Sequence, residues 1–136
     1  MDYKELTKAA IAAREAAYIP YSNFAVGAAL LTKSGKLYQG CNIENAGYSP
    51  TNCAERTAVF KAVSEGEREF AAIAVAGWPR GGAPAPAYPC GVCRQVLMEF
   101  VKPDTFEVII CTGEDDYMVY TLDELLPHGF GPADLA

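Results

Sequence analysis

The chain has 136 residues, of which 51% are hydrophobic and 21% charged, and this composition is typical of one globular domain, here residues 1–136. The net charge of −6 disfavours nucleic acid as a partner, because duplex binding depends on Lys and Arg contacts to phosphate. The same charge favours a small, weakly charged substrate. No apolar run could span a membrane and no apolar segment follows a basic start, so we expect a cytoplasmic protein.

The predicted elements begin with a helix over residues 2–18, in which apolar residues recur at helical spacing until Pro20 ends the pattern. Residues 24–32 alternate between apolar and small or polar side chains, as a strand does. A turn at Gly35 follows, and residues 37–43 return as a second strand. The two strands are therefore predicted to form a hairpin.

Helices and strands continue through the second half of the chain after a polar loop. A Thr followed three residues later by a Glu is a capping-box pattern, which predicts the start of the last helix. Crossover helices between strands predict a mixed sheet with helices packed on it. The predicted elements are a helix over 53–64, a strand over 70–76, a helix over 91–101, strands over 106–111 and 117–120, and a short helix from Thr121.

Five cysteines occur, and an odd number in a cytoplasmic protein argues against a disulfide framework. Cys41 and Cys111 lie in apolar, strand-like runs, where we expect small buried side chains. Cys53, Cys90 and Cys93 differ, because each lies at or near the predicted start of a helix. The partial positive charge of a helix N-terminus stabilises a thiolate there.

Three such thiolates predict a zinc site with the fourth tetrahedral position left for water, which is the arrangement of a catalytic site. Three thiolates on a dication leave about one excess negative charge, which would weaken the pull of the metal on the proton of that water. Arg56 and Arg94 each lie next to a predicted ligand in the sequence. Either arginine could hydrogen-bond a sulfur and offset the charge.

Other interpretations of these motifs remain open. A CxxC pair such as Cys90 and Cys93 can be a redox site, although that would leave Cys53 and Glu55 without a role. Glu55 can also form a helix-capping pair with Asn52, three residues earlier. Residues two apart on an ideal helix point about 200° apart, so Cys53 and Glu55 can share a site only at the first turn.

Cys53-Ala54-Glu55 and Pro89-Cys90-Gly91-Val92-Cys93 match the C-x-E … P-C-x-x-C pattern of zinc-dependent nucleoside and nucleobase deaminases. From about residue 5 onward the chain resembles the small homotetrameric cytidine deaminases. This resemblance implies one zinc ion per chain, conversion of cytidine and deoxycytidine to uridine and deoxyuridine with release of ammonia in pyrimidine salvage, and a homotetramer with shared active sites. It also implies a three-layer α/β/α fold with a mixed five-stranded sheet and helices on both faces. The further segments that carry it are Gly40–Ala46, Cys53–Ala58, Cys93–Val96, Leu125–Pro127 and Phe130–Pro132.

The resemblance also implies roles for single residues. Cys53, Cys90 and Cys93 would hold the zinc ion, and Glu55 would move protons from the activated water to N3 and then to the leaving amine. Phe24 beside the base is equally compatible with an ordinary core position in its strand. The implied substrate residues are Asn42 and Glu44 for the ribose hydroxyls, Phe24 for the pyrimidine, the Ala54 backbone for the polar edge of the base, Tyr48 near the sugar, and Phe130 in the site of a neighbouring subunit.

Two segments, the loop over residues 79–88 and His128, depart from the pattern of the resembling family. Other functions also share parts of the pattern. A deaminase of a cytosine-containing antibiotic should lack the pair Asn42 and Glu44. A non-enzymatic zinc module would leave Glu55 and the missing fourth ligand unexplained, and a polynucleotide deaminase conflicts with the acidic charge.

Overall fold

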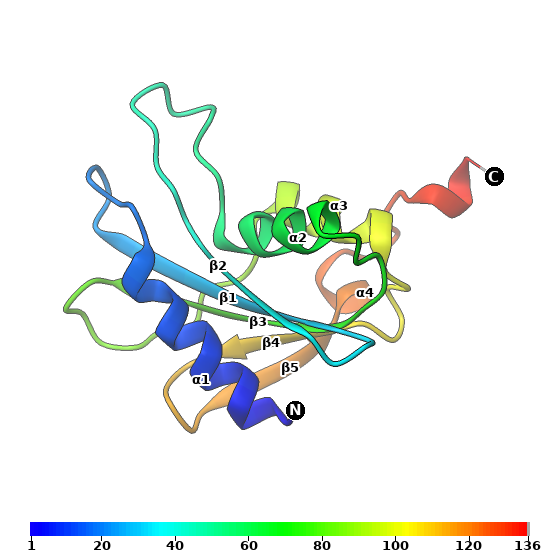
Figure 1. Cartoon of the computed structure of the whole chain (residues 1–136), viewed down its shortest axis with the longest axis horizontal. Helices are drawn as coiled ribbons and strands as arrows, with labels where there is room; N and C mark the ends of the chain where they lie inside the picture. Colours follow the sequence, from blue (N-terminus) through cyan, green and yellow to red (C-terminus); the bar gives the residue numbers. More distant parts are fainter. Residues whose placement is uncertain (136) are drawn as a thin grey trace.

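The computed structural model describes residues 1–135 and contains a five-stranded sheet covered by helices (Figure 1). No helix in this part of the chain is long and apolar enough to cross a membrane. The strands are β1 (Phe24–Thr32), β2 (Leu37–Cys41), β3 (Phe70–Pro79), β4 (Glu107–Cys111) and β5 (Tyr117–Thr121), and the helices are α1 (Tyr3–Ala13), α2 (Ala54–Ser64), α3 (Gly91–Phe100) and α4 (Leu122–Leu125), with 3-10 turns at Arg14–Ala16 and Pro132–Asp134.

The strand order is β2-β1-β3-β4-β5. Strands β3 and β4 are parallel, because α3 carries the chain back across the sheet between them, and every other neighbouring pair is antiparallel. The predicted mixed sheet with five strands is therefore confirmed. The predicted hairpin is also present as the antiparallel pair of β1 and β2.

Helices cover both faces of the sheet. Helix α1 lies on one face, and α2 and α3 lie side by side on the other (Figure 1). Under α2 and α3 the core is built from large apolar side chains, whereas the core under α1 contains many alanines. The three-layer α/β/α architecture expected from the sequence is thus confirmed.

Two glycines of the sheet allow helices to approach it closely. A Cβ atom at Gly27 would lie 2.1 Å from the carbonyl oxygen of Ala10 in α1. A Cβ atom at Gly40 would lie 2.5 Å from both the Ala54 oxygen and the Ala58 nitrogen in α2. Because Gly40 has no side chain, the first turn of α2 rests directly on β2. This contact fixes the end of the helix that begins beside Cys53.

Three predicted element boundaries are wrong in the details. The helix predicted over residues 2–18 changes to a 3-10 turn at Arg14, whose buried guanidinium donates to the carbonyl oxygens of Ala25 and Trp78. The strand predicted over 70–76 extends to Pro79 because it stays paired with β1 throughout. The strand predicted over 37–43 ends at Cys41, since the next side chain takes over the pairing with β1.

Candidate functional site

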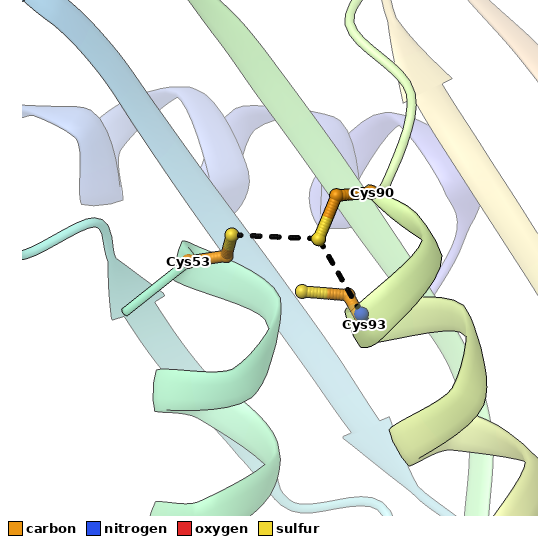
Figure 2. A group of neighbouring side chains, drawn as sticks. All are labelled: Cys53, Cys90 and Cys93. Atoms are coloured by element: carbon orange, nitrogen blue, oxygen red, sulfur yellow. Dashed lines mark hydrogen bonds between the residues drawn. The ribbon is translucent and has the colours of Figure 1, made fainter. Parts of the chain in front are cut away.

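The site begins with three cysteine side chains at the N-termini of two neighbouring helices (Figure 2). Cys53 and Cys90 are the N-cap residues of α2 and α3, and Cys93 lies in the first turn of α3. Their sulfur atoms all lie within 4.8 Å of one another, and the Sγ atoms of Cys53 and Cys90 are 3.7 Å apart. The sulfur of Cys90 also accepts a hydrogen bond from the backbone N–H of Cys93 at 3.5 Å.

These sulfur positions fit a tetrahedral zinc ion. Zinc–sulfur bonds of about 2.3 Å at tetrahedral angles place two thiolates about 3.8 Å apart, close to the distance between Cys53 and Cys90. The same distance is far longer than the ~2.05 Å of a disulfide bond, and all three cysteines are free. The chain therefore presents a three-cysteine cluster that could hold a metal. Cys41 and Cys111 lie outside this cluster, and burial raises the pKa of the Cys111 thiol to about 11.

The two arginines predicted to offset the sulfur charge lie in different surroundings. An Arg56 Nη atom donates to the sulfur of Cys53 at 3.2 Å. Arg94 instead donates to the backbone carbonyl oxygens of Pro89, at 2.7 Å, and Leu125. Hydrogen bonds from Cys93 and then from Arg56 lower the pKa of Cys53 to about 5, which favours its thiolate form. Arg94 holds the backbone in front of Cys90 rather than a sulfur.

Glu55 is buried in the first turn of α2, with 4% of its surface exposed. Burial raises the pKa of its carboxyl group to about 7, so this group is poised to exchange protons near neutral pH. The alternative role of Glu55 as a capping partner of Asn52 is not realised, because Cys53 is the N-cap and Asn52 donates to the Thr57 hydroxyl instead. Since Cys53 has extended backbone dihedrals, the 200° separation expected on a regular helix does not apply to it.

A cavity of about 160 Å³ adjoins Cys53, Cys90 and Glu55. Residues from the N-terminus of α2, from β1 and from the segment before α3 converge on it, and Cys53 and Cys90 are the two more accessible members of the cysteine cluster. The lining is mainly apolar with a few polar groups, as is usual for a small-molecule site. The residues are Phe24, Val26, Asn42, Thr51, Asn52, Cys53, Ala54, Glu55, Val75, Ala87, Tyr88 and Cys90.

Asn42 lies on this cavity and also supports the sheet. Its Oδ1 atom accepts from the Val26 N–H at 3.0 Å and its Nδ2 atom donates to the Phe24 carbonyl at 2.8 Å, so the side chain continues the pairing of β2 with β1. Because an amide oxygen has two lone pairs, Oδ1 keeps one acceptor site. Sequence reasoning gave Asn42 only a substrate role and missed this structural one.

Glu44 lies outside the residues that line the cavity. One carboxylate oxygen accepts from the N–H groups of Tyr21 and Ser22 at 3.0 and 3.2 Å, and the other accepts from the Ser22 hydroxyl. These bonds, the Ser22 hydroxyl first, lower the pKa of Glu44 and keep it ionised. A carboxylate offers about four lone-pair sites, so acceptor capacity remains.

The other predicted substrate residues divide into two groups. Phe24 and Ala54 line the cavity, and Phe24 is 38% exposed rather than packed in the core. Tyr48 and Phe130 do not line it and are largely exposed, at 78% and 56%. The Phe130 carbonyl accepts from the Gln95 side chain, which ties the C-terminal segment to the exposed side of α3.

Several lining residues were missed from the sequence, notably Thr51, Ala87 and Tyr88. Their positions close to the two cysteine motifs were the only available signal. Each lies within three residues of a predicted metal ligand, but nothing in the sequence states which side of the chain faces the cavity.

Comparison with known proteins agrees with this site. Residues 1–110 match the family model of the cytidine and deoxycytidylate deaminase zinc-binding region. A cytidine deaminase of Halalkalibacterium halodurans is 51% identical to the chain, and the aligned region covers 99% of this chain and 98% of the relative. A probable cytidine deaminase of Dictyostelium discoideum is 42% identical over 99% of this chain and 90% of its own length.

Solved structures give the same result for the fold. The crystal structure of a cytidine deaminase from Burkholderia pseudomallei superposes with a TM-score of 0.86 at 52% identity and covers 96% of this chain and all of the other. A cytidine deaminase from Mycobacterium tuberculosis superposes with a TM-score of 0.80 at 35% identity, covering 96% of this chain and 98% of the other.

Proposed function

Because the chain belongs to the cytidine and deoxycytidylate deaminase family, we propose that it hydrolyses cytidine and deoxycytidine to uridine and deoxyuridine with release of ammonia. The observation that carries this proposal is a three-cysteine cluster beside a buried carboxyl group on one small cavity. A redox pair would use two of these cysteines and would give Glu55 no task. A deaminase uses all four side chains.

The proposed cofactor is one zinc ion per chain, held by Cys53, Cys90 and Cys93. When bound, zinc supplies a Lewis acid that makes a water molecule acidic enough to react near neutral pH. Arg56 supports the sulfur cluster, because its hydrogen bond to Cys53 offsets part of the thiolate charge.

Glu55 performs the proton transfers in this proposal. Its carboxylate accepts a proton from the attacking water and delivers it to N3 of the base as oxygen adds to C4. The same group then moves the hydroxyl proton to the amino nitrogen, so the C–N bond breaks and ammonia leaves. A pKa near 7 suits a group that must accept and donate in one cycle.

The residues that line the cavity support the proposed orientation of the substrate. The base enters with its reacting edge toward the cysteines, beside Phe24 and against the Ala54 backbone. The ribose lies toward the outer side, where Asn42 and Glu44 accept its hydroxyl protons with their remaining lone pairs. Tyr48 is exposed and is proposed as a further neighbour of the sugar.

A homotetramer with shared sites is the proposed assembly. The cavity of about 160 Å³ is smaller than the ~300–1,000 Å³ usual for ligand pockets, which supports a site that a neighbouring chain completes. Phe130 does not line the cavity of its own chain and is exposed, which leaves it available to complete the site of a neighbour.

The test is an ultraviolet assay that follows loss of the cytosine absorbance with cytidine, deoxycytidine, cytosine and dCMP in parallel. We expect turnover of both nucleosides, far slower turnover of free cytosine, and little with dCMP. No turnover of either nucleoside by the zinc-loaded protein would refute the proposal.

A further inference from the structure

The segment that connects β3 to α3 is a long connection without helix or strand (Figure 1). Few hydrogen bonds hold it to the rest of the described chain. Its start is fixed where Arg80 and Asn23 exchange hydrogen bonds, and its end is fixed where Arg94 binds the Pro89 carbonyl. Between these points, residues 83–87 form no hydrogen bond with the rest of the described chain. This stretch consists of three alanines and two prolines and is mostly exposed.

Ala87 lies against Gly77 of β3, and a contact between two tyrosines holds the residue that follows. The Tyr88 hydroxyl forms a hydrogen bond of 3.1 Å with the hydroxyl of Tyr120 on β5, 32 residues further along the chain. The two rings also pack edge to face, with centroids 5.7 Å apart and an interplanar angle of 66°. Tyr120 is itself partly buried against the core beneath α2 and α3, so it is the firmer member of the pair.

The contact lies directly behind the wall of the cavity. Ala87, Tyr88 and Cys90 all line the cavity. Cys90 is held at the start of α3 by the Arg94 N–H, whereas residues 87–89 form no backbone–backbone hydrogen bond in the described chain. We propose that Tyr88 and Tyr120 are positioning residues for the deamination, whose contact with each other holds the wall formed by residues 87–90 in its binding geometry. This inference rests on the proposed function, because the pair controls how well the nucleoside fits against that wall.

Loss of the contact should weaken substrate binding more than the chemical step. If the wall occupies its binding geometry only part of the time, the apparent affinity falls by that fraction, whereas saturating substrate restores the geometry. An aromatic pair contributes enough to change such an equilibrium by about 2- to 10-fold. We therefore expect Tyr120→Ala to raise KM for cytidine by about 2- to 10-fold and to change kcat by less than about twofold.

Tyr117→Ala is the matched control. Tyr117 lies on the same strand, is also half-buried, and packs at the same centroid separation of 5.7 Å against another tyrosine, Tyr3. It packs with the core beneath α1, on the opposite face of the sheet from Tyr120, and it does not line the cavity. A loss of stability alone would affect both variants, so only Tyr120→Ala should raise KM.

The experiment compares wild type with Tyr88→Ala, Tyr120→Ala, the double variant, Tyr120→Phe and Tyr117→Ala. For each protein it measures kcat and KM for cytidine, the Kd of the product uridine by calorimetry, the zinc content and the Tm. The proposal expects KM and the uridine Kd to rise together in both single alanine variants, no further rise in the double variant, and recovery to within about twofold in Tyr120→Phe, which keeps the ring. Tyr88→Ala changes an exposed segment and so tests the idea even if Tyr120→Ala does not fold.

Two outcomes would overturn the inference while leaving the proposed function intact: an unchanged KM and uridine Kd in Tyr88→Ala, or an equal rise in Tyr117→Ala. Failure of the proposed function is distinguishable, because wild type would then not deaminate cytidine at all.

Discussion

Replacement of Glu55 by glutamine tests the chemistry most directly, because the change removes proton transfer and little else. Glutamine has nearly the same shape as glutamate, and the site is 4% exposed, so the side chain should stay in place at the start of α2. A neutral amide also lacks the cost of a buried carboxylate, and we therefore expect the fold and the zinc content to be retained.

The expected loss of activity is large. One general acid–base group contributes about 10²–10⁴-fold, and Glu55 is proposed to act on the water, on N3 and on the amine. We expect kcat to fall by about 10⁴-fold or more, which corresponds to about 5.5 kcal/mol of the barrier. KM should change by less than about threefold, because these transfers occur after binding.

The assay combines stopped or continuous cytidine turnover with elemental analysis of zinc on the same sample. Glu99→Gln is the control, because it makes the same chemical change at an exposed position of α3. If Glu55→Gln with full zinc kept a tenth of the wild-type kcat, Glu55 would be a structural residue and the proposed mechanism would be wrong.

Three further predictions concern the metal, the sugar and the assembly. Cys90→Ala should lose zinc and activity while Cys111→Ala keeps both, as measured by elemental analysis; full zinc occupancy in Cys90→Ala would contradict the ligand set. Glu44→Ala should lower kcat/KM for cytidine by about 10- to 100-fold with zinc unchanged, since a hydroxyl of the sugar loses its acceptor, and an equal effect on free cytosine would contradict a sugar role. Deletion of residues 128–136 should lower activity and retain zinc, and a fully active monomer in a sizing experiment would refute the shared site.

Local patterns in the sequence predicted most of the fold. The capping box at Thr121 and Glu124 forms as expected, and the short apolar runs are strands of the sheet. The match of Cys53-Ala54-Glu55 and Pro89-Cys90-Gly91-Val92-Cys93 to the deaminase pattern, rather than their spacing alone, predicted which sulfurs come together. What could not be predicted depends on contacts between distant residues, such as Tyr88 with Tyr120, which no local pattern encodes.

The site residues that sequence reasoning described least completely are those with two tasks. Asn42 and Glu44 were assigned to a sugar, yet each also holds backbone at or before the start of β1: Asn42 bonds Phe24 and Val26 in the strand, and Glu44 bonds the turn at Ser22 before it. These tasks support each other. A side chain already fixed by two or three hydrogen bonds loses little further freedom when a hydroxyl binds its remaining lone pair, so the entropic cost of binding falls.

This lower entropic cost of binding also explains why the proposed sugar contacts are placed just after β2 rather than on a loop without hydrogen bonds. Phe24, whose carbonyl accepts from Asn42, is also one of the aromatic residues that line the cavity. A change at Asn42 would therefore disturb the base and the sugar together, whereas Glu44 does not line the cavity and bonds the turn at Ser22 rather than the backbone of Phe24 itself. Glu44→Ala is for this reason the cleaner test of ribose recognition, and a loss of turnover confined to nucleosides is the result that separates the two roles.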